Sequence, residues 1–122
     1  MRATHRALRG GQLSQLTREH SLYAELAAAG SKDLPPRAEC SFGHVITRAL
    51  GMAGEAMPDI TADSVLPGDL YLLSSDGLDP VPPERLIELL DFPSELSCNA
   101  MVREALERGS RDNVTAVVLR VG

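Results

Sequence analysis

Short apolar stretches bounded by turn residues predict β-strands near both ends of the chain and in its middle. The segment "ALRGGQLSQL", residues 7–16, predicts two short strands joined at Gly10-Gly11, because a glycine pair accepts the positive φ angles of a tight turn. The apolar run "LYLLSS", residues 70–75, predicts a buried strand that follows the turn "LPGD". The last strand is predicted over residues 114–121, "VTAVVLRV".

Two further strands are predicted between these ends. "HVITRAL", residues 44–50, and "DITADSVL", residues 59–66, contain β-branched residues with partial alternation. The link "SKDLPPRAECSFG", residues 31–43, is expected to be a loop, since two consecutive prolines do not fit inside a regular element.

Apolar residues at helical spacing predict three helices. "EHSLYAELAAAG" has Ser21 as a candidate N-cap and Gly30 as its stop. "PPERLIELLD" places its prolines in the first turn, where a helix tolerates them. In "PSELSCNAMVREALERG" Gly109 is a natural end, and a stripe is expected to face the core, formed by Cys98, Val102, Ala105 and Leu106.

The order of these elements favours an α+β fold with a mostly antiparallel sheet, since strands from both ends of the chain enclose a group of helices. Apolar residues make up 43% of the 122 residues, which suits a globular chain. The net charge of −5, without a Lys/Arg cluster, argues against nucleic acid as a partner.

Composition and residue spacing also limit the cellular compartments and the kinds of metal site that are consistent with this chain. No apolar run approaches the roughly 20 residues of a membrane span, and no apolar region follows the basic N-terminus as in a secretory signal. Cys40 and Cys98 lie far apart, which indicates a reducing compartment. We therefore expect a cytoplasmic protein. The histidines show no zinc-binding spacing.

Two aspartates differ from the other acidic residues because each lies at the rim of an apolar strand. Asp76 follows the strand at 70–75 in "SSDG", and Asp112 precedes the last strand in "RGSRDNVTAVVL". Each has a structural alternative: Asp-Gly is a frequent hairpin turn, and Asp-Asn frequently forms loops and caps strand entries. If the two carboxylates converge, their options are to pair with arginine, to share a proton, or to bind a hard divalent cation.

Four motifs occur in an order that resembles the metal-dependent (PPM, type 2C) serine/threonine protein phosphatases of bacteria. They are "LSQLTREHSLYAEL", "VITRALG", "LPGDLYLLSSDGL" and "ERGSRDNVTAVVLRV". The resemblance covers almost the whole chain and corresponds to the C-terminal half of that family. It implies a partial β-sandwich of mostly antiparallel strands flanked by helices.

The resemblance also implies a centre of two Mn²⁺ or Mg²⁺ ions that activates water for attack on a phosphoserine or phosphothreonine. By the match, Asp76 and Asp112 are metal ligands. Gly77 allows a close backbone approach, and Ser75 and Asn113 orient the carboxylates. The implied partners are phosphorylated proteins, in opposition to a serine/threonine kinase.

The chain departs from the family pattern upstream. The family's "DGxGGH" turn and "GDSR" segment do not occur, and Arg2-Ala3 is read as the last remnant of the latter. Residues 1–122 are thus expected to be a partial domain without its N-terminal portion, with an incomplete metal centre and no activity alone. Asp79 lies one position before the family's second aspartate, whose place Pro80 takes, and His44 replaces an asparagine.

Two other interpretations remain. The chain is alternatively a degenerate phosphatase fold kept as a non-catalytic binding or regulatory module. An unrelated sandwich with coincidental Asp-Gly and Asp-Asn turns is the third, and it predicts that Asp76 and Asp112 lie far apart.

Overall fold

The computed structural model describes residues 2–55 and 57–122 of the chain. Two compact units are present: one contains the residues up to Arg18 together with Ser64–Gly122, and the other is Glu19–Asp63. Among the described residues, no helix is both long enough and apolar enough to cross a membrane.

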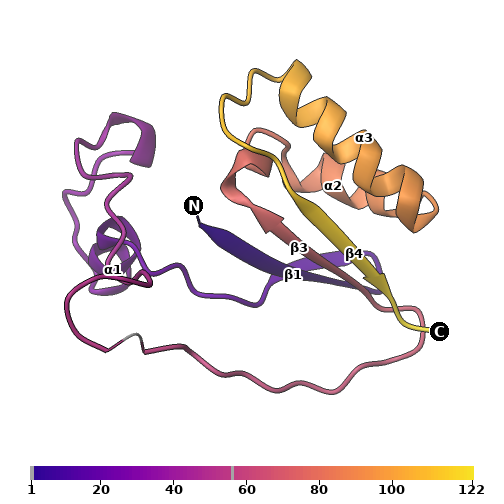
Figure 1. The fold of residues 1–122 in the computed structure, drawn as a ribbon, viewed down its shortest axis with the longest axis horizontal. Coiled ribbons are helices and arrows are strands. Elements are labelled where there is room, and N and C mark those ends of the chain that lie inside the picture. Colours follow the sequence, from indigo (N-terminus) through magenta and orange to yellow (C-terminus); the bar gives the residue numbers. More distant parts are fainter. Residues whose placement is uncertain (1, 56) are drawn as a thin grey trace. The chain divides into compact units, whose positions relative to one another are not determined.

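A four-stranded sheet forms the base of the first unit (Figure 1). Its strands are β1 (Ala3–Arg9), β2 (Gln12–Gln15), β3 (Leu70–Ser75) and β4 (Ala116–Arg120), in the order β2-β1-β3-β4 and antiparallel at every pairing. The predicted hairpin is confirmed: Gly10 and Gly11, with φ angles of 57° and 78°, make its turn. The predicted α+β fold with an antiparallel sheet is confirmed as well.

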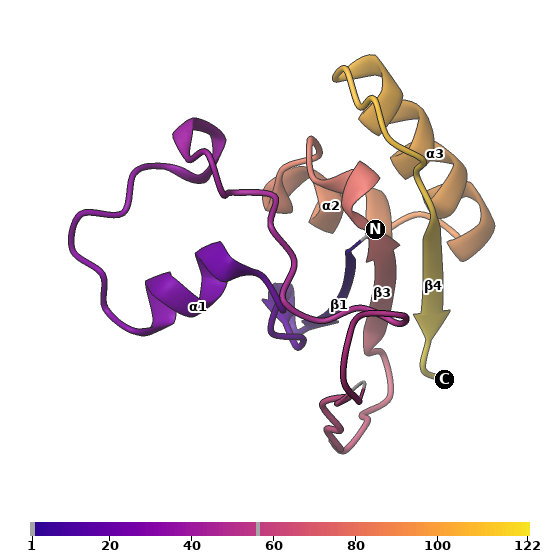
Figure 2. The same ribbon diagram turned by 60° about the vertical axis from the view of Figure 1, so that its left-hand side comes forward.

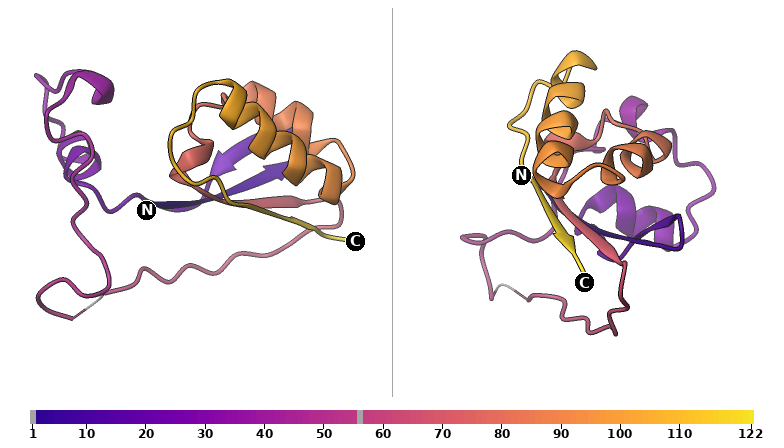
Figure 3. Two further views of the ribbon diagram at one scale, coloured as in Figure 1. Left: turned by 45° about the horizontal axis from the view of Figure 1, so that its top comes forward. Right: turned by 90° about the vertical axis from the view of Figure 1, so that its right-hand side faces the viewer.

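Helices α2 (Pro83–Leu90) and α3 (Ser94–Glu107) pack on one face of this sheet (Figure 3). A short 3-10 helix, η2 (Asp76–Leu78), connects β3 to them. The helices and the sheet enclose one apolar core, formed by Leu70, Leu72, Leu78, Val81, Leu86, Leu89, Leu90, Met101 and Ala105. The side chains of β3 that face the helices thus anchor the strand from which Asp76 follows.

Of the predicted core stripe of α3, Ala105 is buried, Cys98 and Val102 are half-buried, and the prediction is wrong for Leu106. The buried residues of this helix are Ser97, Met101 and Ala105, whereas Leu106 is 56% exposed. Spacing of four residues places the buried three in a single row along the helix, and a narrow row suffices because α2 and the sheet already supply most of the core. The predicted stop at Gly109 agrees with its φ of 87°.

The second unit contains helix α1 (Leu22–Ala28), coloured violet in Figure 2, and a 3-10 helix, η1 (Arg37–Glu39), within the predicted loop. Ser21 caps α1 as predicted, since its Oγ accepts the N–H of Ala24 at 3.1 Å. An ion pair between Arg37 and Glu19 ties the loop to the chain before the helix.

The strands predicted over residues 44–50 and 59–66 do not form. Residues 44–50 contain turns and one isolated bridge, between Ser21 and Ile46, and residues 59–66 have no regular secondary structure. Ile60 is 89% exposed. β-Branched residues favour a strand only where a neighbouring strand pairs with the backbone and buries one face, and these segments lack such a neighbour.

Candidate metal centre

Strand β3 holds Asp76 at the rim of the sheet. The strand is anchored by Leu72, which is fully buried, and η2 is anchored by Leu78, which is 1% exposed. Between these two anchors the backbone N–H of Asp76 donates to the carbonyl oxygen of Arg2 at 3.0 Å. The position of the Asp76 backbone is thus set by core packing on both sides and by a main-chain hydrogen bond.

The loop that carries Asp112 is hydrogen-bonded to the segment that carries Asp76. Ser75 Oγ donates to the carbonyl of Asn113 and accepts the N–H of Thr115, each at 3.0 Å. Ser110 Oγ donates to the carbonyl of Gly77 at 2.8 Å. Two aspartates that are far apart in the sequence therefore lie on loops in direct contact, contrary to what an unrelated fold with coincidental turns predicts.

Gly77 makes this contact possible. A Cβ at this position would lie 2.3 Å from the carbonyl oxygen of Asn113 and 3.1 Å from the Cα of Val114. Atoms do not approach so closely without bonding, so any side chain here would push the two loops apart. Only glycine fits the observed geometry.

The two oxygens of the Asp76 carboxylate differ in their contacts with the described residues. Its Oδ2 lies 3.4 Å from the Arg2 Nε. Its Oδ1 is buried and has no hydrogen-bond partner among the described residues. A buried carboxylate oxygen without a partner is costly, and a divalent cation satisfies such an oxygen well. This orphaned atom fits the metal-ligand role predicted for Asp76.

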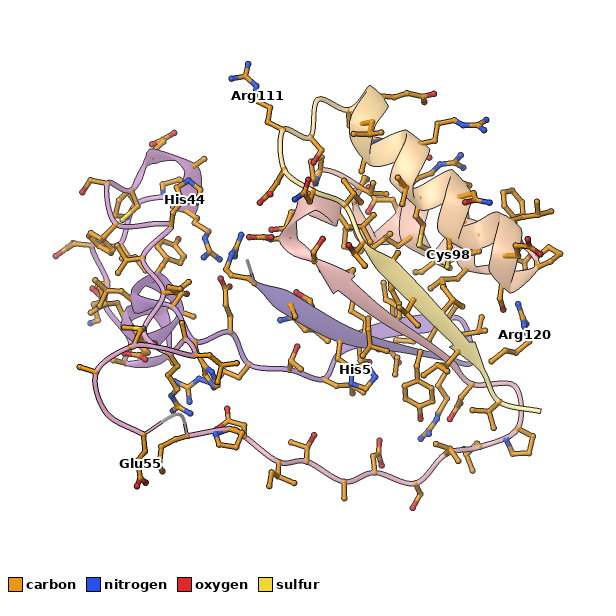
Figure 4. The ribbon with its side chains drawn as sticks, in the orientation of Figure 1. His5, His44, Glu55, Cys98, Arg111 and Arg120 are labelled. Carbon is orange, nitrogen blue, oxygen red and sulfur yellow. The ribbon has the colours of Figure 1, made fainter. Side chains whose placement is uncertain are left out.

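Asp112 is exposed, and its Oδ1 accepts the backbone N–H of Asn113 at 2.7 Å. This bond is the local contact that the loop-forming alternative predicts. Arg111, the preceding residue, points outward from the same loop (Figure 4). The carboxylate of Asp112 therefore has local support from the backbone and is exposed to solvent.

The predicted supporting residues act through the backbone as much as through side chains. Ser75 links the two loops through its hydroxyl, whereas Asn113 contributes its carbonyl oxygen and its N–H. Sequence reasoning missed Ser110 and Thr115, which complete the link. Their only signal was their place, on either side of the "DN" pair. In the described part of the chain, no group of three His, Cys, Asp or Glu side chains is arranged to hold a metal ion.

Two arginines neutralise the acidic end of η2. Arg2 contacts Asp79 as well as Asp76, with 3.0 Å between Arg2 Nη2 and Asp79 Oδ2. Arg6 is half-buried beside Ser74; burial lowers the pKa of its guanidinium, and the charge of Asp79 opposes this shift. The sequence had linked Arg2 to a family remnant but gave no sign of this contact.

No family model matches the chain. It is nevertheless 37% identical over 118 residues to the serine/threonine protein phosphatase PstP of Mycobacterium tuberculosis, a match that covers 93% of this chain and 22% of PstP. It is 34% identical over 116 residues to the protein phosphatase PhpP of Streptococcus pneumoniae, covering 92% of this chain and 47% of PhpP.

Solved structures agree with these relatives. The crystal structure of the Mycobacterium tuberculosis phosphatase PstP/Ppp superposes with a TM-score of 0.86 at 34% identity, over 98% of this chain and 51% of that one. The catalytic domain of PstP in complex with two manganese ions has a TM-score of 0.79 at 36% identity, over 95% of this chain and 48% of that one.

The chain is thus a homologue of the bacterial PPM-type serine/threonine protein phosphatases, as the order of its motifs had predicted. It corresponds to the C-terminal part of these proteins and spans about half the length of PhpP and of the solved catalytic domains.

Proposed function

We propose that the chain is the C-terminal portion of a Mn²⁺- or Mg²⁺-dependent phosphatase that hydrolyses phosphoserine and phosphothreonine in proteins. Asp76 and Asp112 supply two carboxylate ligands of its metal centre. The substrates are cytoplasmic phosphoproteins, and the enzyme opposes a serine/threonine kinase. The observation that carries the proposal is the buried Oδ1 of Asp76, which has no hydrogen-bond partner among residues 2–55 and 57–122, on a segment bonded to the Asp112 loop.

The residues of this chain have defined tasks in that chemistry. Asp76 and Asp112 offer the hard oxygen ligands that Mn²⁺ and Mg²⁺ prefer. Ser75, Gly77 and Asn113 keep the two loops in contact so that the carboxylates stay near each other. The bound ions, when present, lower the pKa of a water molecule and neutralise charge on the phosphoryl oxygens.

Without the remainder of a phosphatase domain the chain is proposed to be inactive, since two carboxylates cannot complete a centre of two ions. The test is Mn²⁺-dependent hydrolysis of p-nitrophenyl phosphate by this chain and by a version extended upstream to full domain length. We expect turnover only from the extended version. In that version Asp76→Asn and Asp112→Asn remove most activity, whereas Glu107→Gln, an exposed change on α3, leaves it unchanged. Absence of activity in both versions would contradict the enzymatic proposal.

A second candidate is a non-catalytic binding or regulatory module. It is favoured by the absence, among the described residues, of any group of three side chains arranged to hold a metal ion. The coding sequence upstream of Met1 distinguishes the two: an in-frame "DGxGGH" and "GDSR" support the enzyme, and stop codons support the module.

A further inference from the structure

The pairing of β1 with β3 brings Arg2 beside Asp76. The register sets Ala3 opposite Ser75, so the residues that follow in each direction, Arg2 and Asp76, also meet. The carbonyl of Arg2 accepts the Asp76 N–H at 3.0 Å. Its guanidinium then reaches two carboxylates: Nε lies 3.4 Å from Asp76 Oδ2, and Nη2 lies 3.0 Å from Asp79 Oδ2.

We propose that Arg2 is a positioning residue for the cation site. Its guanidinium, anchored on Asp79, holds Oδ2 of Asp76 and so leaves Oδ1 turned toward the cation. Asp79 is then the anchor of Arg2 and not itself a metal ligand. This inference deepens the proposed metal centre and rests on it.

The geometry gives each carboxylate a different task. The terminal torsion of an aspartate is broad, so fixing one carboxylate oxygen selects the direction of the other. In Asp76 the fixed oxygen is Oδ2, and the oxygen without a hydrogen-bond partner in the described part of the chain is Oδ1. In Asp79 the shorter contact, 3.0 Å, already goes to Arg2, and Arg6 adds a second favourable charge. Asp79 therefore has its countercharge without a metal ion.

An effect of charge alone and an effect of carboxylate orientation predict opposite results for Arg2→Gln and the same result for Asp79→Asn. Arg2→Gln removes a positive charge near the site, and Asp79→Asn removes a negative one. If only charge matters, the first tightens cation binding and the second weakens it. If Asp79 is itself a ligand, Asp79→Asn abolishes binding while Arg2→Gln tightens it. If Arg2 positions Asp76 through its anchor, both substitutions weaken binding.

The experiment is a titration of the ¹⁵N-labelled chain with Mn²⁺ alone, followed by paramagnetic broadening of the amide signals of residues 75–78 and 112–115. The broadening detects Mn²⁺ bound close to a given amide even when the affinity is low, and it does not require enzymatic activity. We expect Arg2→Gln and Asp79→Asn each to weaken binding about tenfold, the lower end of the range for residues that orient metal ligands. The double variant is expected to bind no more weakly than either single one, because both break the same link.

Matched controls separate this effect from a general loss of charge or of folding. Arg103→Gln and Glu107→Gln make the same charge changes at exposed positions of α3 and are expected to leave the affinity unchanged. Arg2→Lys keeps the charge but has no fork to span two carboxylates, so it should bind as weakly as Arg2→Gln. If Arg2→Gln does not give the NMR spectrum of a folded protein, Arg2→Lys replaces it as the test of the role of Arg2.

The outcomes distinguish the inference from the function on which it rests. Tighter binding by Arg2→Gln, or full affinity in Arg2→Lys, overturns the role of Arg2 while the metal centre stands. Broadening that is absent in the wild type, or that persists in Asp76→Asn, overturns the metal centre and the inference with it.

Discussion

Replacement of Gly77 by alanine tests the contact that brings the two aspartates together. The added Cβ would lie 2.3 Å from the Asn113 carbonyl oxygen, whereas ordinary contacts begin near 3.4 Å, so the loops must separate by about 1.1 Å. The same oxygen accepts the hydroxyl of Ser75 at 3.0 Å, and that bond would stretch or break. Overpacking costs about 1–3 kcal/mol and a lost hydrogen bond about 1 kcal/mol, so we expect a loss near 3 kcal/mol.

Urea unfolding of the wild type and Gly77→Ala, with an unchanged m-value, measures this loss. The matched control is Gly122→Ala, since a Cβ there meets no atom within 4 Å, and its effect should stay within about 0.5 kcal/mol. Gly109→Ala separates crowding from backbone strain, because its φ is 87° with open space around it. It should cost about 1 kcal/mol. A loss below about 0.5 kcal/mol in Gly77→Ala would refute the close-contact argument.

Three further substitutions probe strand β3 and the residue that precedes it. Leu72→Ala empties a fully buried position of β3 and should cost about 2–5 kcal/mol in urea unfolding. Ser75→Ala should lose about 1–3 kcal/mol and weaken Mn²⁺ binding, whereas the exposed Ser14→Ala changes neither. Hydrogen bonds from Arg9 lower the pKa of the Asp69 carboxyl from 3.8 to about 2. The stabilising effect of the ionised Asp69 is therefore complete above about pH 5 and is lost progressively as the pH falls toward about 1, so acid unfolding of Asp69→Asn should be flatter in that interval.

Local signals in the sequence predicted the elements whose stability is largely local. The glycine pair of the hairpin, the Ser21 cap and the stop at Gly109 each mark an element end in the structure. The strand at 70–75 followed from its apolar run. The strands expected at 44–50 and 59–66 failed because strand formation depends on a partner, which residue type alone does not reveal.

The candidate site likewise has one part that the sequence predicted and one part that it did not. The order of the motifs predicted that Asp76 and Asp112 belong together, and their loops are in contact. The fork of Arg2 was not predictable, because it depends on the register that sets Ala3 opposite Ser75 across a separation of more than seventy residues. Chemistry that depends on register becomes visible only in three dimensions.

The structure also decides between the two explanations of the Asp76-Gly77 pair. A hairpin turn would join two adjacent strands and would use glycine for its positive φ. Instead, the pair opens the 3-10 helix η2, which leads to α2, and Gly77 is not among the glycines with positive φ. The hairpin explanation is therefore wrong for this pair. What requires glycine at position 77 is the Asn113 backbone, and that contact holds the two carboxylate loops together.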